Sequence, residues 1–488
     1  MEHLQTQEQR TYSAVIGLEF HVHLATRTKM FCGCRVTYGD APNTHTCPVC
    51  LGHPGALPVI NEKAIELGVM AGLALNCEVA GRAEFARKNY FYPDLPKGYQ
   101  ISQFDLPICT GGYLDVPVGD ETVRIGLTRL HLEEDAAKNV HVGTSGRMHG
   151  SVGSMVDFNR GGTPLMEIVT EPDIPSPEAA RAAANHLKEI LRAVGVSEAD
   201  MEKGQLRCDA NVSIRNPDGS FGTKTELKNM NSFRFVERGL IAELARQREI
   251  LEGGGTVEQT TLHYDPETDE VHELRSKEQA HDYRYFPEPD LLPLELSEAW
   301  VNGIQARLPE LPEGMRARFV ENYGLSAYDA GVLTSDRNLA AFYEKVAAEV
   351  DAKQASNWIS GDLRAQLNEA GVGIAESRVT PEHVIELIEL VQNAEISRST
   401  ARTVLEKVFE TGDAPTAIVE REGLASMGGD ELSGVVDGVI ADNPNEAERV
   451  QAGDKKVIGF LVGQTMKATR GNADGGRVRE LLLEKLGS

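Results

Sequence analysis

Four cysteines near the N-terminus form two closely spaced pairs, Cys32 with Cys34 and Cys47 with Cys50. Thiolates at this spacing can present four sulfur atoms tetrahedrally to Zn²⁺. His45 and His53 lie near enough in the sequence to replace one cysteine. Because the protein would supply all four ligands, we predict a closed, structural zinc site that braces a loop. The alternative is a group of four buried cysteines without a metal.

Acidic and imidazole side chains recur along strand-like segments. Residues 16–24 are apolar at every second position, and residues 205–215 alternate in the same way, which favours strands with one packed and one polar face. Glu167 stands among apolar neighbours, where an unpaired carboxylate is costly. The candidate site residues from these segments and from residues 129–135 are Glu19, His21, Glu133, Glu167 and Asp209, beside Arg129 and His131.

This set of side chains predicts a metal site. Carboxylates together with an imidazole are suitable ligands for a Mg²⁺ ion that carries nucleotide phosphates. Taken singly, each is more often a surface charge or part of a salt bridge. The sequence contains no G-x-x-x-x-G-K-[ST] phosphate loop, no G-x-G-x-x-G fingerprint and no kinase-type catalytic loop. Nor does it contain an amidase-type serine motif or a Cys–His pair suited to splitting glutamine.

Two segments mix cations with aromatic residues. Residues 86–97 contain Lys88, and residues 281–287 contain Arg284 between two tyrosines. Stacking together with cationic contact can hold an unpaired RNA end. Tyrosine and phenylalanine in such loops are more often packing residues.

The elements that must position these residues divide the chain into an α+β part and a helical part. Strand patterns dominate up to about residue 295, interrupted by two predicted helices, residues 177–194 after Ser176 as N-cap and residues 233–251 before a glycine run. Beyond residue 296 the apolar spacing is helical. With 488 residues, two to four domains are expected. We predict a body over residues 1–295, a helical domain over 296–408 and a small helical tail over 409–488.

Composition is ordinary for a soluble protein, with 41% hydrophobic and 25% charged residues. The net charge of −25 disfavours nucleic acid, but residues 449–488 hold eight Lys/Arg against four Asp/Glu. A solvated amphipathic helix explains that local excess equally well. No apolar run approaches the roughly 20 residues of a membrane span, the N-terminus lacks a signal-peptide layout, and the odd count of seven cysteines argues against a disulfide framework. We expect a cytoplasmic protein without a membrane partner.

Seven segments of the first 290 residues, in order, resemble the signatures of the GatB family, which belongs to the tRNA-dependent amidotransferases. The C-terminal segment GQTMKATR resembles the YqeY-like tail of the same family, so the resemblance covers nearly the whole chain. The seven segments are VIGLEFHV (15–22), RKNYFYPDLPKGYQISQ (87–103), RLHLEED (129–135), DFNRGGTPLMEIVTEPD (157–173), RCDANVSIR (207–215), ELKNMNSFRF (226–235) and LRSKEQAHDYRYFPEPD (274–290).

The resemblance implies a cradle-shaped α+β domain similar in fold to glutamine synthetase and the guanidino kinases, followed by a helical domain and a YqeY-like tail that contacts tRNA. It implies an ATP-dependent ligase that phosphorylates the side-chain carboxylate of misacylated Glu-tRNA(Gln) or Asp-tRNA(Asn). Ammonia would come from an amidase subunit, GatA, with GatC as a small third subunit. The synthetase that makes the misacylated tRNA is a further expected partner.

By the same resemblance, His21, Glu133 and Glu167 are the expected Mg²⁺ ligands, and Glu19 and Asp209 are further members of the site. The cysteine quartet matches those members of the family that hold zinc. Contacts to ATP are assigned from motif position and charge to Lys88, Arg275 and Arg284.

Two other functions stay open from the residues alone. A zinc-braced RNA-binding adaptor explains the cysteines, the aromatic segments and the basic tail, but leaves Glu133 and Glu167 without a role. A free-standing ligase acting on a small acid has little use for a basic helical tail. The choice between the two tRNA substrates is not encoded in these motifs.

Overall fold

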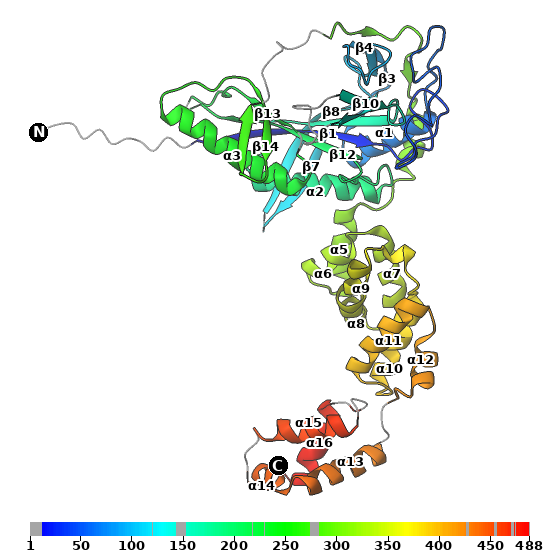
Figure 1. Cartoon of the computed structure of the whole chain (residues 1–488), viewed down its shortest axis with the longest axis vertical. Helices are drawn as coiled ribbons and strands as arrows, with labels where there is room; N and C mark the ends of the chain where they lie inside the picture. The colour runs from blue at the N-terminus through cyan, green and yellow to red at the C-terminus, as the bar shows by residue number, and fades with distance from the viewer. Residues whose placement is uncertain are drawn as a thin grey trace, which may run out of the picture. The chain divides into compact units, whose positions relative to one another are not determined.

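The computed structural model describes residues 12–119, 121–142, 153–216, 218–228, 230–273, 283–425, 429–452, 456–469, 473 and 475–487 (Figure 1). The chain divides into two compact units, Met1–Leu311 and Pro312–Ser488. The first is mixed α/β, and every described element of the second is helical. This agrees with the predicted change from strand to helical patterns.

Strand β1 (Ala14–His23) lies in the middle of the main sheet of the first unit. It pairs antiparallel with β11 (Pro164–Thr170) on one side and with β12 (Leu206–Ile214) on the other. The predicted alternation is confirmed, because the apolar residues of one face are buried: Ile16, Leu18, Phe20 and Val22.

The main sheet extends from β1 in both directions. Beyond β12 come β13 (Thr225–Lys228), β14 (Thr261–Asp265) and β15 (Glu270–Glu273). Beyond β11 come β8 (Glu121–Glu134), β6 (Cys109–Thr110) and β2 (Glu78–Val79), and β7 (Tyr113–Val118) also pairs with β8. Strands β13 and β14 run parallel, whereas the other described pairs in the sheet run antiparallel.

Helices cover the apolar face of this sheet. Helix α2 (Pro177–Ala193) begins after the predicted N-cap Ser176, whose side chain accepts from the backbone of Ala179, and α3 (Phe233–Glu252) ends before Gly253. Both predicted helices are confirmed, and Figure 1 shows them side by side along one face of the sheet. Helix α1 (Glu62–Ala74) packs close to Leu132 of β8. The opposite face keeps the polar side chains.

In the described part of the first unit, three smaller sheets accompany the main one. Strand β4 (Ala86–Asn89) lies between β16 (Phe286–Pro287) and β5 (Tyr99–Ser102), so the two aromatic segments, distant in sequence, are neighbours. Strands β9 (Lys138–Val142) and β10 (Gly153–Asp157) form a pair, as do β3 (Arg82–Ala83) and β17 (Leu294–Glu295).

Helix α4 (Glu298–Gln305) belongs to the first unit. Ile304 is buried in its core, Trp300 packs against the same core, and Arg307 forms a 2.7 Å ion pair with Glu66 of α1. The change of pattern at residue 296 marks the end of the strands, but the apolar side of the next helix still packs against the body.

The second unit begins with ten consecutive helical elements around one core that reaches from Phe319 to Val419, beyond the predicted boundary at residue 408. The elements are α5 (Pro312–Tyr323), α6 (Ala327–Leu333), α7 (Arg337–Ala347), α8 (Ala352–Asn357), the π-helix η1 (Trp358–Leu363), α9 (Arg364–Ala370), the 3₁₀ turn η2 (Ile374–Glu376), α10 (Pro381–Gln392), α11 (Arg398–Thr411) and α12 (Pro415–Glu422).

The C-terminal helices bury a separate apolar cluster that runs from Leu432 to Leu486. They are α13 (Gly429–Asp442), α14 (Pro444–Gln451), α15 (Ile458–Ala468) and α16 (Gly475–Leu486). Division of the chain into domains at residues 296 and 409 stays a prediction.

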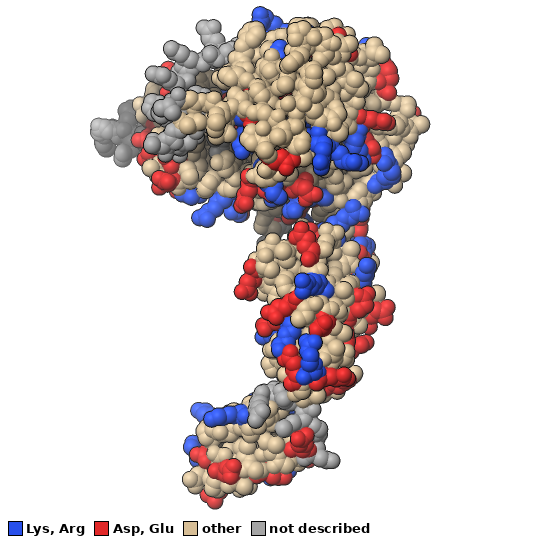
Figure 2. Space-filling view, turned by 45° about the vertical axis from the view of Figure 1, so that its right-hand side comes forward, with Lys and Arg blue, Asp and Glu red and all other residues tan. Residues whose placement is uncertain are grey.

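Basic and acidic side chains lie side by side on the face of helices α5–α12 that Figure 2 draws, whereas on the C-terminal helices the basic ones gather at the upper left of this view. Part of the basic excess of the tail is also neutralised locally, since Lys485 pairs with Asp437 at 2.7 Å and Arg477 with Glu480 at 3.1 Å.

Candidate functional site

The register of three antiparallel strands places His21, Glu167 and His131 in one row. His21 of β1 lies opposite Glu167 of β11, and Glu167 lies opposite His131 of β8. Directly paired residues project from the same face of a sheet, so their side chains meet. Glu167 Oε2 is 3.3 Å from His21 Nε2 and 3.5 Å from His131 Nε2.

Two further carboxylates extend this row into two overlapping triplets. Glu19 Oε1 lies 3.8 Å from His21 Nε2, and Glu133 Oε2 lies 3.7 Å from His131 Nε2. In Glu19–His21–Glu167 and in His131–Glu133–Glu167, one potential ligand atom per residue lies within 4.8 Å of the others. Glu167 belongs to both triplets, which we call the carboxylate–histidine cluster.

Burial makes this cluster unusual. His131, Glu133 and Glu167 are only 4%, 2% and 6% exposed. Burial raises the pKa of Glu133 and Glu167, but the neighbouring imidazoles outweigh it and hold both pKa values below the ordinary glutamate value. For His21, burial lowers the pKa, but the hydrogen bond to Glu167 and the charge of Glu133 raise it overall. The cluster therefore favours anionic carboxylates that attract a cation.

The donor set fits a hard divalent cation. Carboxylate oxygens with imidazole nitrogens suit Mg²⁺, and Ser102 Oγ holds Glu133 Oε2 at 3.1 Å, which fixes the carboxylate in place. Of the three predicted ligands, His21 and Glu133 fall in different triplets joined by Glu167. His131 completes the second triplet. Its place on the polar side of residues 129–135 was visible in the sequence, but its pairing with Glu167 was not.

Asp209 lies beside the cluster without joining either triplet. It is opposite Glu19 in the β1–β12 register, and its Oδ2 is 3.4 Å from Lys228 Nζ. Lys228 also contacts Glu226 Oε1 at 2.9 Å. Burial lowers the pKa of Lys228, but the two carboxylates raise it overall, so the lysine remains cationic.

Asp135 is a buried carboxylate at the edge of the cluster that the sequence motifs did not single out. It is 4% exposed, and its oxygens lie 2.6 Å from His23 Nε2, 3.1 Å from Arg207 Nη2 and 3.5 Å from Arg160 Nε. Burial raises its pKa, but Arg207, the hydrogen bond to His23 and Arg160 hold the pKa well below the ordinary value. The carboxylate ties three distant segments together.

The predicted nucleotide contacts have different positions. Lys88 Nζ lies 5.0 Å from the centroid of the Tyr283 ring. Burial lowers the pKa of Lys88, but the negative charge of Glu133 and other neighbours raises it overall. The ammonium group is therefore stabilised by the carboxylates of the cluster. Arg284 is exposed with a φ of 44°, and its carbonyl accepts from Asn89 Nδ2 at 2.9 Å. Arg275 lies outside the described residues.

Aromatic rings form an open surface beside Lys88. Phe104 and Tyr285 are stacked with centroids 4.0 Å apart and an interplanar angle of 5°, and Tyr283 contacts Tyr285 edge to face. Phe104 is 50% exposed, so part of this stack is accessible to a further group.

The cysteine quartet converges. The sulfur atoms of Cys32, Cys34, Cys47 and Cys50 lie within 4.8 Å of one another, which fits four ligands around one metal. The hydrogen bond from Cys32 lowers the pKa of Cys50 to about 4, and Lys29 Nζ donates to its sulfur at 3.6 Å. His45 instead lies 2.7 Å from Asp40, and neither His45 nor His53 belongs to a described metal cluster.

The family model described as "GatB/GatE catalytic domain" matches residues 14–302, and the one described as "GatB domain" matches residues 341–486. The chain therefore belongs to the GatB family. It is 49% identical over 480 residues to the GatB-type aspartyl/glutamyl-tRNA(Asn/Gln) amidotransferase chain of Persephonella marina, covering 97% of this chain and 99% of that protein. It is 52% identical over 479 residues to the protein of the same name from Moorella thermoacetica, covering 97% and 100%.

Proposed function

We propose that this chain is the GatB component of a tRNA-dependent amidotransferase and that its first unit activates the side-chain carboxylate of Glu or Asp carried by tRNA. The buried carboxylate–histidine cluster carries this proposal, because it lies within the segment that matches the catalytic-domain model. The relatives' name supports Glu-tRNA(Gln) and Asp-tRNA(Asn) as substrates.

Activation is required because a carboxylate is a poor electrophile. Transfer of the γ-phosphoryl group of ATP to a carboxylate oxygen releases ADP and gives an acyl phosphate. Attack by ammonia on the carbonyl carbon then forms the C–N bond and expels phosphate, and one proton leaves the nitrogen. The protein's part in both steps is to position the reactants, to stabilise negative charge and to keep water away from the acyl phosphate.

His21, Glu133 and Glu167 are proposed to hold Mg²⁺, with His131 and Glu19 completing the two triplets. When bound, Mg²⁺ neutralises charge on the nucleotide phosphates. Ser102 fixes the Glu133 carboxylate, and the Arg129 guanidinium, 3.6 Å from Glu167, does the same for the shared ligand. Asp209 keeps the cationic Lys228 beside Glu19.

The remaining assignments concern substrates. Lys88 supplies positive charge for phosphate oxygens, and Arg275 and Arg284 stay proposed contacts to ATP. The open stack of Phe104 and Tyr285 suits the unpaired 3′ end of tRNA.

The proposed assembly contains an amidase subunit (GatA), a small third subunit (GatC) and tRNA, with the synthetase as a transient partner. A glutamine-splitting motif is absent from the sequence, which supports an external source of ammonia. We place the assembly in the cytoplasm. No helix in the described ranges has the length and apolarity needed to span a membrane. A glutamine-synthetase-like cradle, a helical domain and a YqeY-like tail remain the proposed description of the fold.

Amide formation by the reconstituted complex, with ammonium chloride as donor, tests this function. Ammonium bypasses the amidase, so only activation is measured. We expect Glu-tRNA to be converted only when ATP and Mg²⁺ are present, and free glutamate to be left unchanged. Conversion of free glutamate would instead identify a small-acid ligase. No conversion of either substrate, with tRNA still bound, would favour the adaptor.

We also propose that the cysteine quartet binds a structural zinc ion. The purified chain is expected to contain about one equivalent of zinc, and Cys47→Ser to lose most of it and to unfold at a lower temperature. Cys208→Ser, at a buried cysteine outside the quartet, is the control. Elemental analysis and thermal unfolding check both effects. A full zinc content in Cys47→Ser would contradict the assignment.

A further inference from the structure

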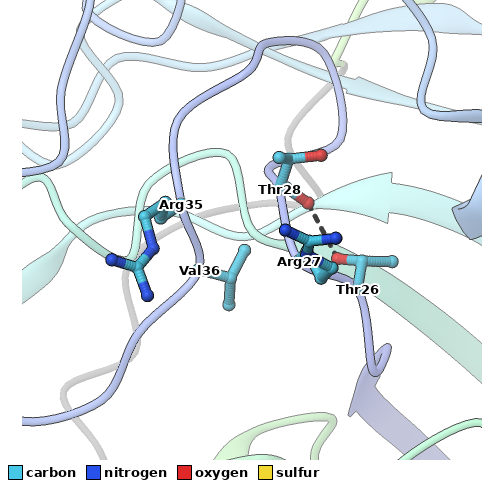
Figure 3. A pocket seen from close by; sticks show the side chains of 5 residues that line it. All are labelled: Thr26, Arg27, Thr28, Arg35 and Val36. Atoms are coloured by element: carbon cyan, nitrogen blue, oxygen red, sulfur yellow. Dashed lines mark hydrogen bonds between the residues drawn. The ribbon is translucent and has the colours of Figure 1, made fainter.

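The chain that follows β1 folds back on itself and places two arginines at one pocket. Thr28 and Arg35 form an isolated antiparallel bridge, and Val36 N donates to Arg27 O at 3.1 Å. Arg27 and Arg35, eight positions apart in the sequence, thereby border the same pocket. Figure 3 shows them on either side of Val36.

The pocket has a volume of about 580 Å³ and is lined by Thr26, Arg27, Thr28, Arg35 and Val36. Both arginines are exposed, and within the described ranges neither forms an ion pair with a carboxylate. The carboxylate of Asp40 is bound by His45, at 2.7 Å, which is the main cause of its lowered pKa, whereas Arg35 contributes least among the groups that shift it. Among the described residues, the lining carries two positive charges and no carboxylate.

The backbone that carries these arginines is anchored. Lys29 N donates to Cys34 O at 2.9 Å, and Asn61 Nδ2 donates to Thr28 O at 3.0 Å. Arg35 directly follows Cys34 of the cysteine quartet, whose sulfurs converge. Because the backbone that carries both guanidinium groups is fixed, less entropy is lost when they bind neighbouring anionic groups of one ligand.

The lining selects one chemical class of ligand. Guanidinium groups match phosphate oxygens through paired N–H donors. The Thr26 hydroxyl donates to Thr28 O at 2.8 Å, the dashed line in Figure 3, whereas the Thr28 hydroxyl accepts from Asn61 and keeps its proton for a ligand. Of the lining residues that the structure describes, Val36 alone is apolar and none carries an aromatic ring. The pocket therefore suits a sugar–phosphate backbone better than a stacked base.

The position suits RNA that reaches the carboxylate–histidine cluster. Arg27 follows His21 by six residues, so their Cα atoms are at most about 22 Å apart. Several unpaired nucleotides span such a distance. We propose that Arg27 and Arg35 bind the sugar–phosphate backbone of the substrate tRNA close to its unpaired 3′ end. This inference rests on the proposed function, because it takes tRNA as the substrate.

Arg27→Ala and Arg35→Ala in the reconstituted complex test the pocket. With ammonium as donor, each variant is expected to raise KM for Glu-tRNA about tenfold and to leave kcat within about twofold. The slope of log Kd against log salt concentration for tRNA should become less steep by about 0.7 for each arginine. KM for ATP should stay unchanged. Arg27→Lys should leave the slope of log Kd against log salt concentration unchanged, because the positive charge is kept. It should still bind tRNA more weakly, because lysine lacks the paired N–H donors of the guanidinium group.

Arg124→Ala is the matched control, since Arg124 is an exposed arginine of the same unit that pairs with Asp115 at 2.7 Å. Pocket variants that bind tRNA like this control, with the wild-type salt slope, would overturn the proposal. A rise in KM for ATP alone would also overturn it and assign the pocket to the nucleotide. Failure of the wild type to form amide refutes the proposed function instead, and direct tRNA binding still tests the pocket.

Discussion

Glu167→Gln is expected to lower kcat of ATP-dependent, ammonium-dependent amidation by about 10³-fold or more. The residue belongs to both triplets of the carboxylate–histidine cluster, so its loss removes a charged ligand from each. A loss of this size corresponds to about 4 kcal/mol of transition-state stabilisation, as expected for a central electrostatic group. Initial rates at saturating Glu-tRNA and ATP over a range of Mg²⁺ concentrations measure it.

The two triplets also predict an order of effects. Glu133→Gln and Glu19→Gln each affect one triplet, so both should lower kcat less than Glu167→Gln does. Glu19 is the more exposed of the two, so Glu19→Gln should lower kcat least. Glu237→Gln is the control, because that carboxylate pairs with Arg181 on the helical side of the sheet. If Glu167→Gln keeps a rate within about threefold of wild type while Glu133→Gln does not, Glu167 is not the shared ligand.

Local patterns predicted the elements well. Alternation over residues 16–24 gave the central strand and its buried face, and the Ser176–Pro177 sequence gave the start of α2. Both signals depend only on neighbouring residues, through the two-residue repeat of a strand and the geometry of a helix cap. The same patterns identified which side chains of β1 are polar, and so proposed Glu19 and His21.

These local patterns could not predict which side chains of different strands lie close together. Whether His21 meets Glu167 depends on the register between strands separated by more than 100 residues, and a shift by one residue would turn the side chains to the opposite face. His131 was visible as a polar residue, but its place between Glu133 and Glu167 follows only from the pairing of β8 with β11. The family resemblance, not the local patterns, is what predicted His21, Glu133 and Glu167 as one set of ligands, and that set stays a prediction.

Domain boundaries show a second limit of prediction from local sequence patterns. The apolar spacing becomes helical at residue 296, yet α4 packs on the first core through Ile304. A change in local pattern marks a change in element type, whereas a domain boundary depends on which core an element packs against.

Asp135→Asn is expected to destabilise the first unit by about 2–4 kcal/mol at pH 7. The carboxylate is buried, hydrogen-bonds to His23 and pairs with Arg207, whose side chain is 41% exposed, so its neutralisation removes both charge-assisted interactions. Because a unit of this size unfolds with a large entropy change, the midpoint should fall by roughly 5–10 °C. Thermal unfolding of both proteins at pH 7 measures the shift.

The pH dependence separates this mechanism from simple loss of packing. The folded-state pKa of Asp135 is held well below the value of about 3.9 in an unfolded chain. Its contribution is therefore complete above about pH 5 and declines as the pH falls through 4 towards the folded-state pKa. The difference in the free energy of unfolding between wild type and Asp135→Asn should therefore become smaller over that pH range. Asp115→Asn, at an exposed pair with Arg124, should change stability by less than about 1 kcal/mol at any pH. If the stability difference between wild type and Asp135→Asn stays constant from pH 7 to the lowest pH at which the protein folds, packing and not charge makes this residue important.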